Sequence, residues 1–186
     1  MPADDILLDA EERMEKAISV LKHALAGIRT GRANPGLVDS LRVEVYGSPT
    51  PIKQVASISA PEVRLLVVQP WEKNMLQTVA KAIQASDLGL NPQDDGQVLK
   101  IPIPPLNEDR RRELVKQAHK LAEESRVAVR NARRDAIDQL KKAQKDGEMP
   151  EDDSRRAVDQ VGKLHDKYIA EVEDVLKKKE AEVMEV

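Results

Sequence analysis

The chain has 186 residues, with 30 basic and 33 acidic side chains and a formal net charge of -3. It contains no cysteine, which excludes disulfides, thiolate metal sites and cysteine nucleophiles and makes a reducing cytoplasm its natural setting. Aromatic residues make up only 2% of the chain, so the core must be aliphatic, and the many charged residues favour long packed helices.

The N-terminal segment predicts a first helix from about Asp5 to Thr30, which Gly31 then breaks. Its acidic start lacks a long apolar run, so it predicts neither a signal peptide nor a membrane span. The apolar residues recur three or four positions apart, as in a helix packed in a bundle: Met14, Ile18, Leu21, Leu25 and Ile28.

The middle of the chain has a different character, because nine of the eleven prolines lie between residues 31 and 105. Four strand-like segments occur there, namely LRVEVY, PIKQVASISA, VRLLVVQP and VLKIPIP. An amphipathic helix is predicted over Lys73 to Ser86. We therefore expect a small β/α/β domain over residues 31–105.

Two further helices are predicted after this domain. Asn107 is a candidate N-cap for a helix running from about Glu108 to Asp146, and a third helix begins near Glu151. The predicted fold is α+β: a three-helix bundle of residues 1–30 and 106–186, with the β/α/β domain inserted. The two connections between them form a predicted hinge of Gly31, Ala33, Asn34, Pro35, Pro102, Pro104 and Pro105.

Motifs for catalysis or metal binding are weak. The segment GRANPG lacks the spacing and the lysine of a phosphate-binding loop. His23, His119 and His165 fall on three different helices without metal-ligand spacing. No nucleophile and base occur at a recognisable spacing, so we expect no enzyme, no cofactor and no metal.

A run of basic residues in the second long helix stands out. From Arg126 to Lys145 there are seven basic and two acidic residues, a local charge of +5. On a helix, five of them fall within an arc of about 100° and form a basic stripe: Arg126, Arg130, Arg133, Arg134 and Lys141. A charge run is often only a solvated face, but arginine suits phosphate. Because interleaved aromatics are missing, phosphate and shape recognition of a folded RNA fits better than base stacking.

Five segments, in this order, resemble the bacterial ribosome recycling factor family: GIRTGRANPGLVD, YGSPTPIKQVASI, ASDLGLNP, IPIPPLNEDRRRELVK and RVAVRNARRDA. The resemblance implies an L-shaped, two-domain protein without a catalytic site. It implies action after translation termination, together with elongation factor G, whose GTP hydrolysis drives separation of the ribosomal subunits and release of messenger RNA and tRNA. The bundle would lie on the large subunit.

By position, the family's RNA-contacting arginines match Arg130 and Arg133, with Arg29 and Arg32 near the hinge. The other stripe residues are added from the helical projection alone. The expected partners are ribosomal RNA of the large subunit and elongation factor G, with no membrane, and the expected state is a monomer. The alternatives are a structural coiled-coil adaptor with a solvated basic face and, more weakly, a hydrolase in the middle segment.

Overall fold

The computed structural model describes residues 2–185. Their contacts divide the chain into two compact units. The bundle unit comprises the chain up to Leu25 together with Lys116–Ala181, and the sheet unit comprises Ala26–Val115 together with the chain from Glu182. The division therefore falls inside long helices, whereas the predicted domain boundaries lie in the loops at 31 and 105.

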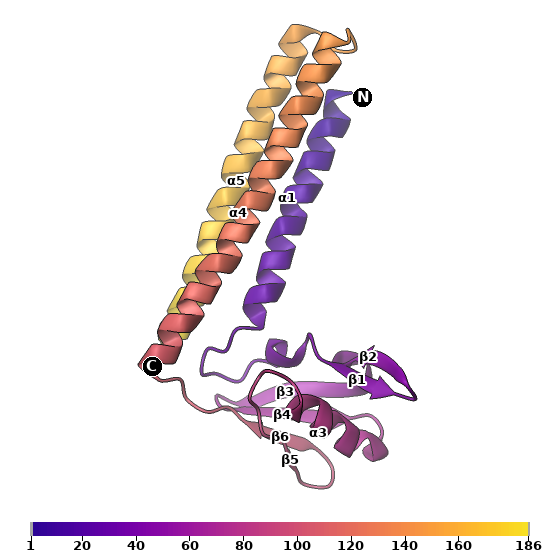
Figure 1. Cartoon of the computed structure of the whole chain (residues 1–186), viewed down its shortest axis with the longest axis vertical. Helices are drawn as coiled ribbons and strands as arrows, with labels where there is room; N and C mark the ends of the chain where they lie inside the picture. Colours follow the sequence, from indigo (N-terminus) through magenta and orange to yellow (C-terminus); the bar gives the residue numbers. More distant parts are fainter. Residues whose placement is uncertain (1, 186) are drawn as a thin grey trace. The chain divides into compact units, whose positions relative to one another are not determined.

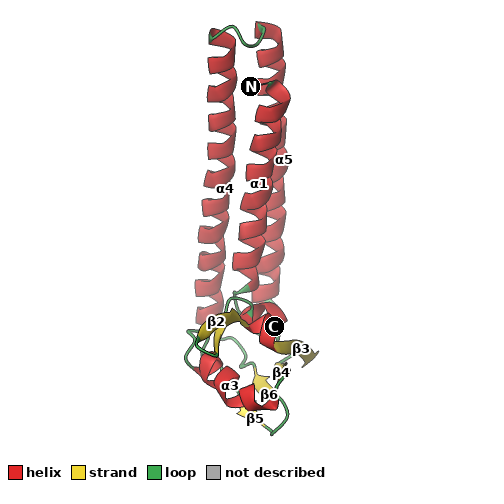
Figure 2. Cartoon of the chain, turned by 90° about the vertical axis from the view of Figure 1, so that its right-hand side faces the viewer, coloured by secondary structure: helices red, strands yellow, loops and turns green. Residues whose placement is uncertain are grey.

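Three long helices lie side by side in the bundle unit (Figures 1 and 2): α1 at Ala3–Ala26, α4 at Glu108–Lys145 and α5 at Glu151–Met184. Each contributes aliphatic residues to one core cluster, including Ile6 from α1, Leu140 from α4 and Val161 from α5. The predicted spacing in α1 is confirmed, since its apolar residues from Met14 to Leu25 at that spacing are buried. The bundle core is thus aliphatic, as the composition requires.

Helix ends follow local chemistry. The first helix ends at Ala26, before Gly27 and short of the predicted Thr30, because glycine is a poor helix residue. Asn107 caps α4 as predicted, its side-chain oxygen accepting from the Arg110 backbone N–H at 2.7 Å. At the other end of α4, Gly147 takes a left-handed φ of 75°, which suits a helix C-terminus.

Polar contacts also join the helices of the bundle unit. The Ser125 hydroxyl of α4 donates to the Ala17 carbonyl of α1 at 3.2 Å. The Tyr168 hydroxyl of α5 donates to Glu15 at 3.1 Å, and the pKa of Tyr168 is raised by burial first and by this hydrogen bond next. These bonds satisfy polar groups that would otherwise be buried at a cost.

The sheet unit contains a four-stranded antiparallel sheet in the order β3-β4-β6-β5 and a separate hairpin. The sheet strands are β3 at Ala56–Glu62, β4 at Leu65–Pro70, β5 at Gln93–Asp94 and β6 at Leu99–Pro102. The hairpin pairs β1 at Arg42–Val45 with β2 at Ser48–Pro51. The helical elements are η1 at Pro35–Val38, α2 at Ile52–Val55, η2 at Lys73–Met75 and α3 at Leu76–Gln84.

The core of this unit is again aliphatic and joins the hairpin, the sheet and α3. Val43 of β1, Leu66 of β4, Val79 of α3 and Ile101 of β6 are all fully buried in it. Leu66 and Ile101 are register partners in neighbouring strands, so both point to the same face. The long helices of the bundle unit, together with a small unit of antiparallel strands and short helices, confirm the predicted α+β class.

One predicted strand was wrong in part. The segment PIKQVASISA is not continuous strand: Pro51 ends β2, Ile52–Val55 form the single turn α2, and β3 starts at Ala56. The turn keeps Ile52 fully buried while the chain passes from the hairpin to the sheet. The hydrophobic pattern of this segment cannot distinguish a helical turn from a strand, because a single buried residue such as Ile52 is compatible with either conformation.

Candidate nucleic-acid interface

The predicted basic stripe borders an open hollow of about 720 Å³ between α4 and α5 of the bundle unit. Helix α4 continues through this region without a proline or glycine, so positions three and four apart share a face. The lining residues are Val127, Arg130, Asn131, Arg133, Arg134, Ile137, Asp138, Lys141 and His165. The lining thus contains four basic side chains and one carboxylate, so the hollow is electropositive.

Arg133, Arg134 and Lys141 are the least restrained of these basic residues. Within the described residues, none of the three has a carboxylate at ion-pair distance. Arg133 extends toward α5, where a Cβ at Gly162 would lie 3.8 Å from its Nη2 atom. A Cβ at that distance would be in ordinary van der Waals contact, so the guanidinium lies directly beside α5 at this glycine.

Arg126 is held differently, by two carboxylates. Its Nε donates to Glu173 at 2.7 Å and its Nη1 donates to Glu123 at 2.8 Å, while its side chain is only 18% exposed. The hydrogen bond to Glu173 is the main reason that the pKa of Arg126 is raised. An RNA phosphate would therefore compete with two internal partners for Arg126, which does not line the hollow.

Glu123 also reaches Arg130, whose Nη1 lies 3.3 Å from its Oε1. The pKa of Glu123 is lowered, first by the hydrogen bond from Arg126 and then by the charge of Arg130, against an opposing effect of burial. Glu123 therefore stays ionised at neutral pH and offsets part of the stripe's positive charge. Counting charges along the sequence from Arg126 onwards misses this residue, because it lies just before the run.

Arg29 and Arg32 belong to the sheet unit, whereas the stripe belongs to the bundle unit. Arg29 donates from Nη2 to the Pro104 carbonyl at 3.1 Å, and its pKa is lowered by burial first and by nearby Arg110 next. Arg32 pairs with Glu185 while its side chain remains 56% exposed. Arg29 thus helps to hold the local backbone, whereas Arg32 has an accessible charge.

The predicted hinge residues make several contacts within the sheet unit. Gly31 has a left-handed φ of 79°, which favours glycine. The Ala33 N–H donates to the Val63 carbonyl at 2.6 Å, and the Asn34 side chain accepts from the Gly36 N–H at 2.9 Å, immediately before Pro35 begins η1. These contacts fix the first connection locally.

The second connection follows β6. Pro102 is the last residue of that strand, and the next residue, Ile103, donates its N–H to the Arg64 carbonyl at 2.8 Å. Pro104 accepts from Arg29, and Pro105 lines a small hollow of about 100 Å³. A hinge function for these residues remains a prediction.

The three histidines do not come together in a metal site. His119 of α4 pairs with Glu180, His23 is exposed near the end of α1, and His165 of α5 lies beside the basic hollow with its Nδ1 2.9 Å from Asp166. Across residues 2–185, no group of three or more candidate ligands could hold a metal ion. In the same part of the chain, no helix is long and apolar enough to cross a membrane.

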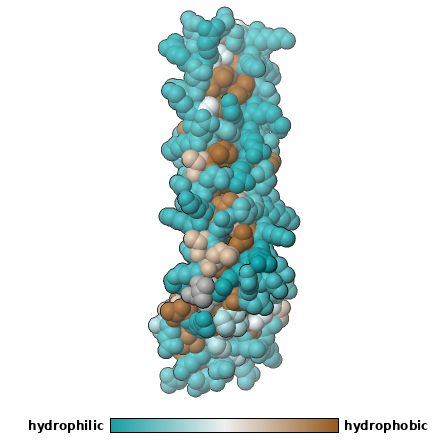
Figure 3. Space-filling model, turned by 90° about the vertical axis from the view of Figure 1, so that its left-hand side faces the viewer, coloured by the Kyte–Doolittle hydropathy of each residue, from teal (hydrophilic) through white to brown (hydrophobic). Residues whose placement is uncertain are grey.

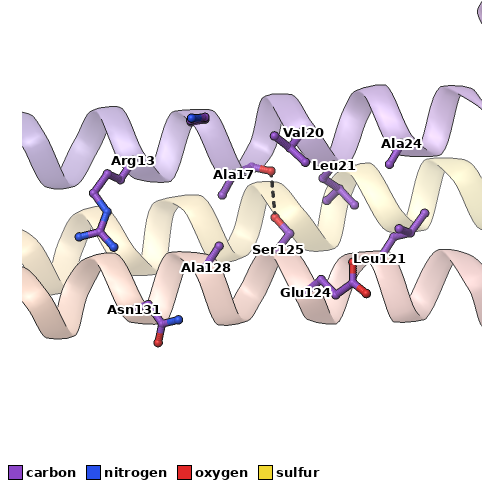
Figure 4. A pocket seen from close by; sticks show the side chains of 11 residues that line it. Arg13, Ala17, Val20, Leu21, Ala24, Leu121, Glu124, Ser125, Ala128 and Asn131 are labelled. Carbon is purple, nitrogen blue, oxygen red and sulfur yellow. Dashed lines mark hydrogen bonds between the residues drawn. The ribbon is translucent and has the colours of Figure 1, made fainter. Parts of the chain in front are cut away.

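A second hollow, of about 460 Å³, lies between α1 and α4 of the bundle unit. Figure 4 shows Val20, Leu21 and Leu121 along it, close to the hydrogen bond from Ser125 to Ala17. Its charged lining is of mixed sign, with Arg13 and Lys16 opposed by Glu124. It therefore lacks the electropositive character of the hollow between α4 and α5.

The surface of the molecule is strongly polar on the face shown in Figure 3. Hydrophilic residues predominate there, and apolar residues form small separate patches. Extended apolar patches are the usual mark of a protein-docking surface. This face therefore gives no support to an adaptor that binds through a broad apolar surface.

Known proteins resemble this chain over nearly its whole length. The family described as ribosome recycling factor matches residues 21–184. The ribosome-recycling factor of Symbiobacterium thermophilum is 54% identical over 182 residues, covering 98% of each chain. That of Caldicellulosiruptor bescii is 55% identical over 177 residues, covering 95% of this chain and 96% of the other.

Two solved structures are also similar. A solution structure of a ribosome recycling factor matches with a TM-score of 0.79 and 44% identity, over 99% of this chain and 98% of the other. A second match has a TM-score of 0.71 and 46% identity over the whole of both chains. It describes the T. thermophilus factor and E. coli elongation factor G bound to the E. coli post-termination complex. With residues 21–184 matched and relatives alike over nearly their whole length, the chain belongs to the ribosome recycling factor family.

Proposed function

We propose that this chain recycles ribosomes: with elongation factor G, and using GTP hydrolysis by that partner, it splits the post-termination ribosome into subunits. Messenger RNA and deacylated tRNA are then released for a new round of translation. The single observation that carries this proposal is the family match over residues 21–184. The place of action is then the cytoplasm, where bacterial ribosomes work.

The basic hollow supplies the physical basis for ribosome binding. Arg130, Arg133, Arg134 and Lys141 surround it on one helix face, and arginine forks suit phosphate oxygens. Each phosphate contact releases counterions, so binding of this kind is strong at low salt. We assign the large-subunit RNA contact first to these four residues, because they line the hollow. Arg32, Arg29 and Arg126 would contribute less, because they do not line the hollow and each has an internal partner.

The chain itself would perform no chemistry in this scheme. Its work would be mechanical: the bundle of residues 1–30 and 106–186 binds RNA, and the domain of residues 31–105 moves about the hinge or transmits force through it. Two proline-rich connections restrict the form that such motion can take. The matched complex with elongation factor G supports that factor as the partner that supplies the energy. We propose that the chain works as a monomer.

Co-sedimentation with purified large ribosomal subunits tests the binding step. A recycling factor should bind saturably, near one copy per subunit, and lose affinity steeply as salt rises. A coiled-coil adaptor with a solvated basic face should show only weak, non-saturating binding. The latter result would contradict the proposal.

A further inference from the structure

The hollow of about 460 Å³ between α1 and α4, called the α1–α4 groove below, has no part in the RNA contact proposed above. Its lining residues come from these two helices alone, and on each helix they recur along one face. On α1 the lining runs from Arg13 near one end to Ala24 near the other, as Figure 4 shows. At 1.5 Å per residue this is about 16 Å, or three helical turns.

The middle of the α1–α4 groove is apolar and open. Val20 of α1 is 60% exposed although it lies beside the bundle core, and Leu121 of α4 is only partly buried. Four lining residues have small side chains: Ala17, Ala24, Ser125 and Ala128. Because helix axes approach more closely where the contacting side chains are small, this surface suits a further helix. The Ser125 hydroxyl already donates to the Ala17 carbonyl, so the apolar part of the groove retains its apolar character.

The two walls of the groove carry opposite charges. Lys16 lies on the α1 wall and Glu124 on the α4 wall, and both side chains are exposed. Among residues 2–185, neither has a hydrogen-bond or ion-pair partner, whereas Arg13 of the same lining is paired with Asp135 at 3.0 Å. An occupant of the groove would therefore meet one free positive charge on one side and one free negative charge on the other.

We infer that the α1–α4 groove binds an amphipathic helix of a partner protein, with an aliphatic face toward Val20 and Leu121. Recognition of this kind uses apolar side chains at i, i+3 or i+4, and i+7, which is the reach of a three-turn groove. The partner helix carries an acidic residue on the flank that meets Lys16 and a basic residue on the flank that meets Glu124. The inference is independent of the proposed ribosome binding.

The mixed charge of the walls distinguishes this occupant from simpler ones. An RNA phosphate or a fatty-acid carboxylate that approached Lys16 would also meet Glu124, which repels it, and an amine would meet the reverse. A helix can present both signs at once, because its two flanks lie on either side of its apolar stripe. The groove thus favours a helix with unlike flanks over a ligand with one charge.

Three synthetic peptides test this charge pattern. Each has about 12 residues, a little over three turns, with leucines three and four positions apart and a side-chain cross-link that keeps it helical. They differ only in their flanks, which are one acidic and one basic, both acidic, or both basic. Because a helix can dock in either direction, these three flank patterns remain distinguishable whichever way the peptide lies.

Fluorescence anisotropy of the labelled peptides measures their affinity for the full chain. The parent should prefer the mixed peptide by about threefold, the size expected of exposed ion pairs. Glu124→Lys should shift the preference to the peptide with two acidic flanks, and Lys16→Glu to the peptide with two basic flanks. Both positions are exposed, so these variants should keep the fold, and circular dichroism checks it.

A pair of variants on α1 locates the binding. Val20→Glu places a charge in the apolar part of the groove and should weaken the mixed peptide at least about tenfold, since burying an unpaired charge is costly. Leu8→Glu is the matched control, because Leu8 is 57% exposed on the same helix and does not line the groove. The control should bind as the parent does.

The contrary outcomes are distinct. If no peptide binds the parent, if all three bind it equally, or if Val20→Glu and Leu8→Glu bind alike, the inference is wrong. Sedimentation of the parent alone tests a second copy of the chain as the occupant, and a dimer that Val20→Glu dissociates would overturn the inference. Binding of octanoate in the groove without binding of any peptide would likewise overturn it, since the site would then take a small molecule.

Discussion

Replacing Arg133 with alanine removes a positive charge of α4 that lies beside Gly162 of α5. Arg133 has no carboxylate partner among the described residues and lies beside Gly162. The change should therefore affect RNA binding without breaking an internal ion pair. Because no such pair is lost, we expect the free energy of unfolding to change by less than about 0.5 kcal/mol.

The size of the effect follows from counterion release. If each of the four basic residues around the hollow neutralises one phosphate, the logarithm of affinity should fall with the logarithm of salt with a slope of about -3. Removing Arg133 should bring the slope to about -2.2. The affinity of each protein falls by some factor between about 50 and 200 mM salt. That factor should be about three times smaller for the variant than for the parent.

The assay is equilibrium binding of labelled protein to large ribosomal subunits at several salt concentrations. Arg155→Ala is the matched control, because Arg155 is an exposed arginine of α5 that does not line the hollow and pairs with Glu151 at 3.1 Å. The control should bind with the slope of the parent. If Arg133→Ala and the parent share one affinity and one slope at every salt concentration, the stripe is a solvated face and the reasoning is refuted.

Three further changes test the role of Glu123, the bundle core and the proline-rich connection. Glu123→Gln should raise large-subunit affinity several-fold at low salt, because it frees Arg130 and removes one of the two carboxylate partners of Arg126, whereas Glu124→Gln should not; equal effects of the two in a binding assay would argue against specific neutralisation. Leu140→Ala, at a fully buried position, should lower the free energy of unfolding by about 2 to 5 kcal/mol in urea titration, against almost no change for the 57% exposed Leu8→Ala. Replacing both prolines at 104–105 with glycine should slow subunit splitting in a light-scattering assay while binding stays intact, and unchanged splitting would remove the stiff hinge.

Much of the fold is predictable because the helices obey a simple rule. Long stretches without proline, with apolar residues three or four positions apart, can bury that face only as packed helices. The start of α4 was equally readable, since Asn107 precedes an acidic first turn. The sheet unit was harder, because short segments such as Ile52–Val55 adopt the conformation that buries one residue.

The candidate site was only half predictable. A helical projection correctly places Arg130, Arg133 and Lys141 together, because they share one helix. The same projection groups Arg126 with them, yet its guanidinium turns to Glu123 and Glu173, and only three-dimensional structure shows such pairings between helices. The projection of α4 could not identify His165 and Gly162 either, because both lie on α5. Their contribution depends on how α5 packs against α4.

Splitting of purified post-termination ribosomes, followed by light scattering, tests the recycling function itself. The complete mixture contains this chain, elongation factor G and GTP, and three control mixtures omit one component each. We expect rapid conversion of ribosomes to subunits in the complete mixture alone, and slower conversion when Arg133→Ala replaces the parent at about 200 mM salt. Ribosomes that remain intact in the complete mixture, or that split equally well without this chain, would contradict it.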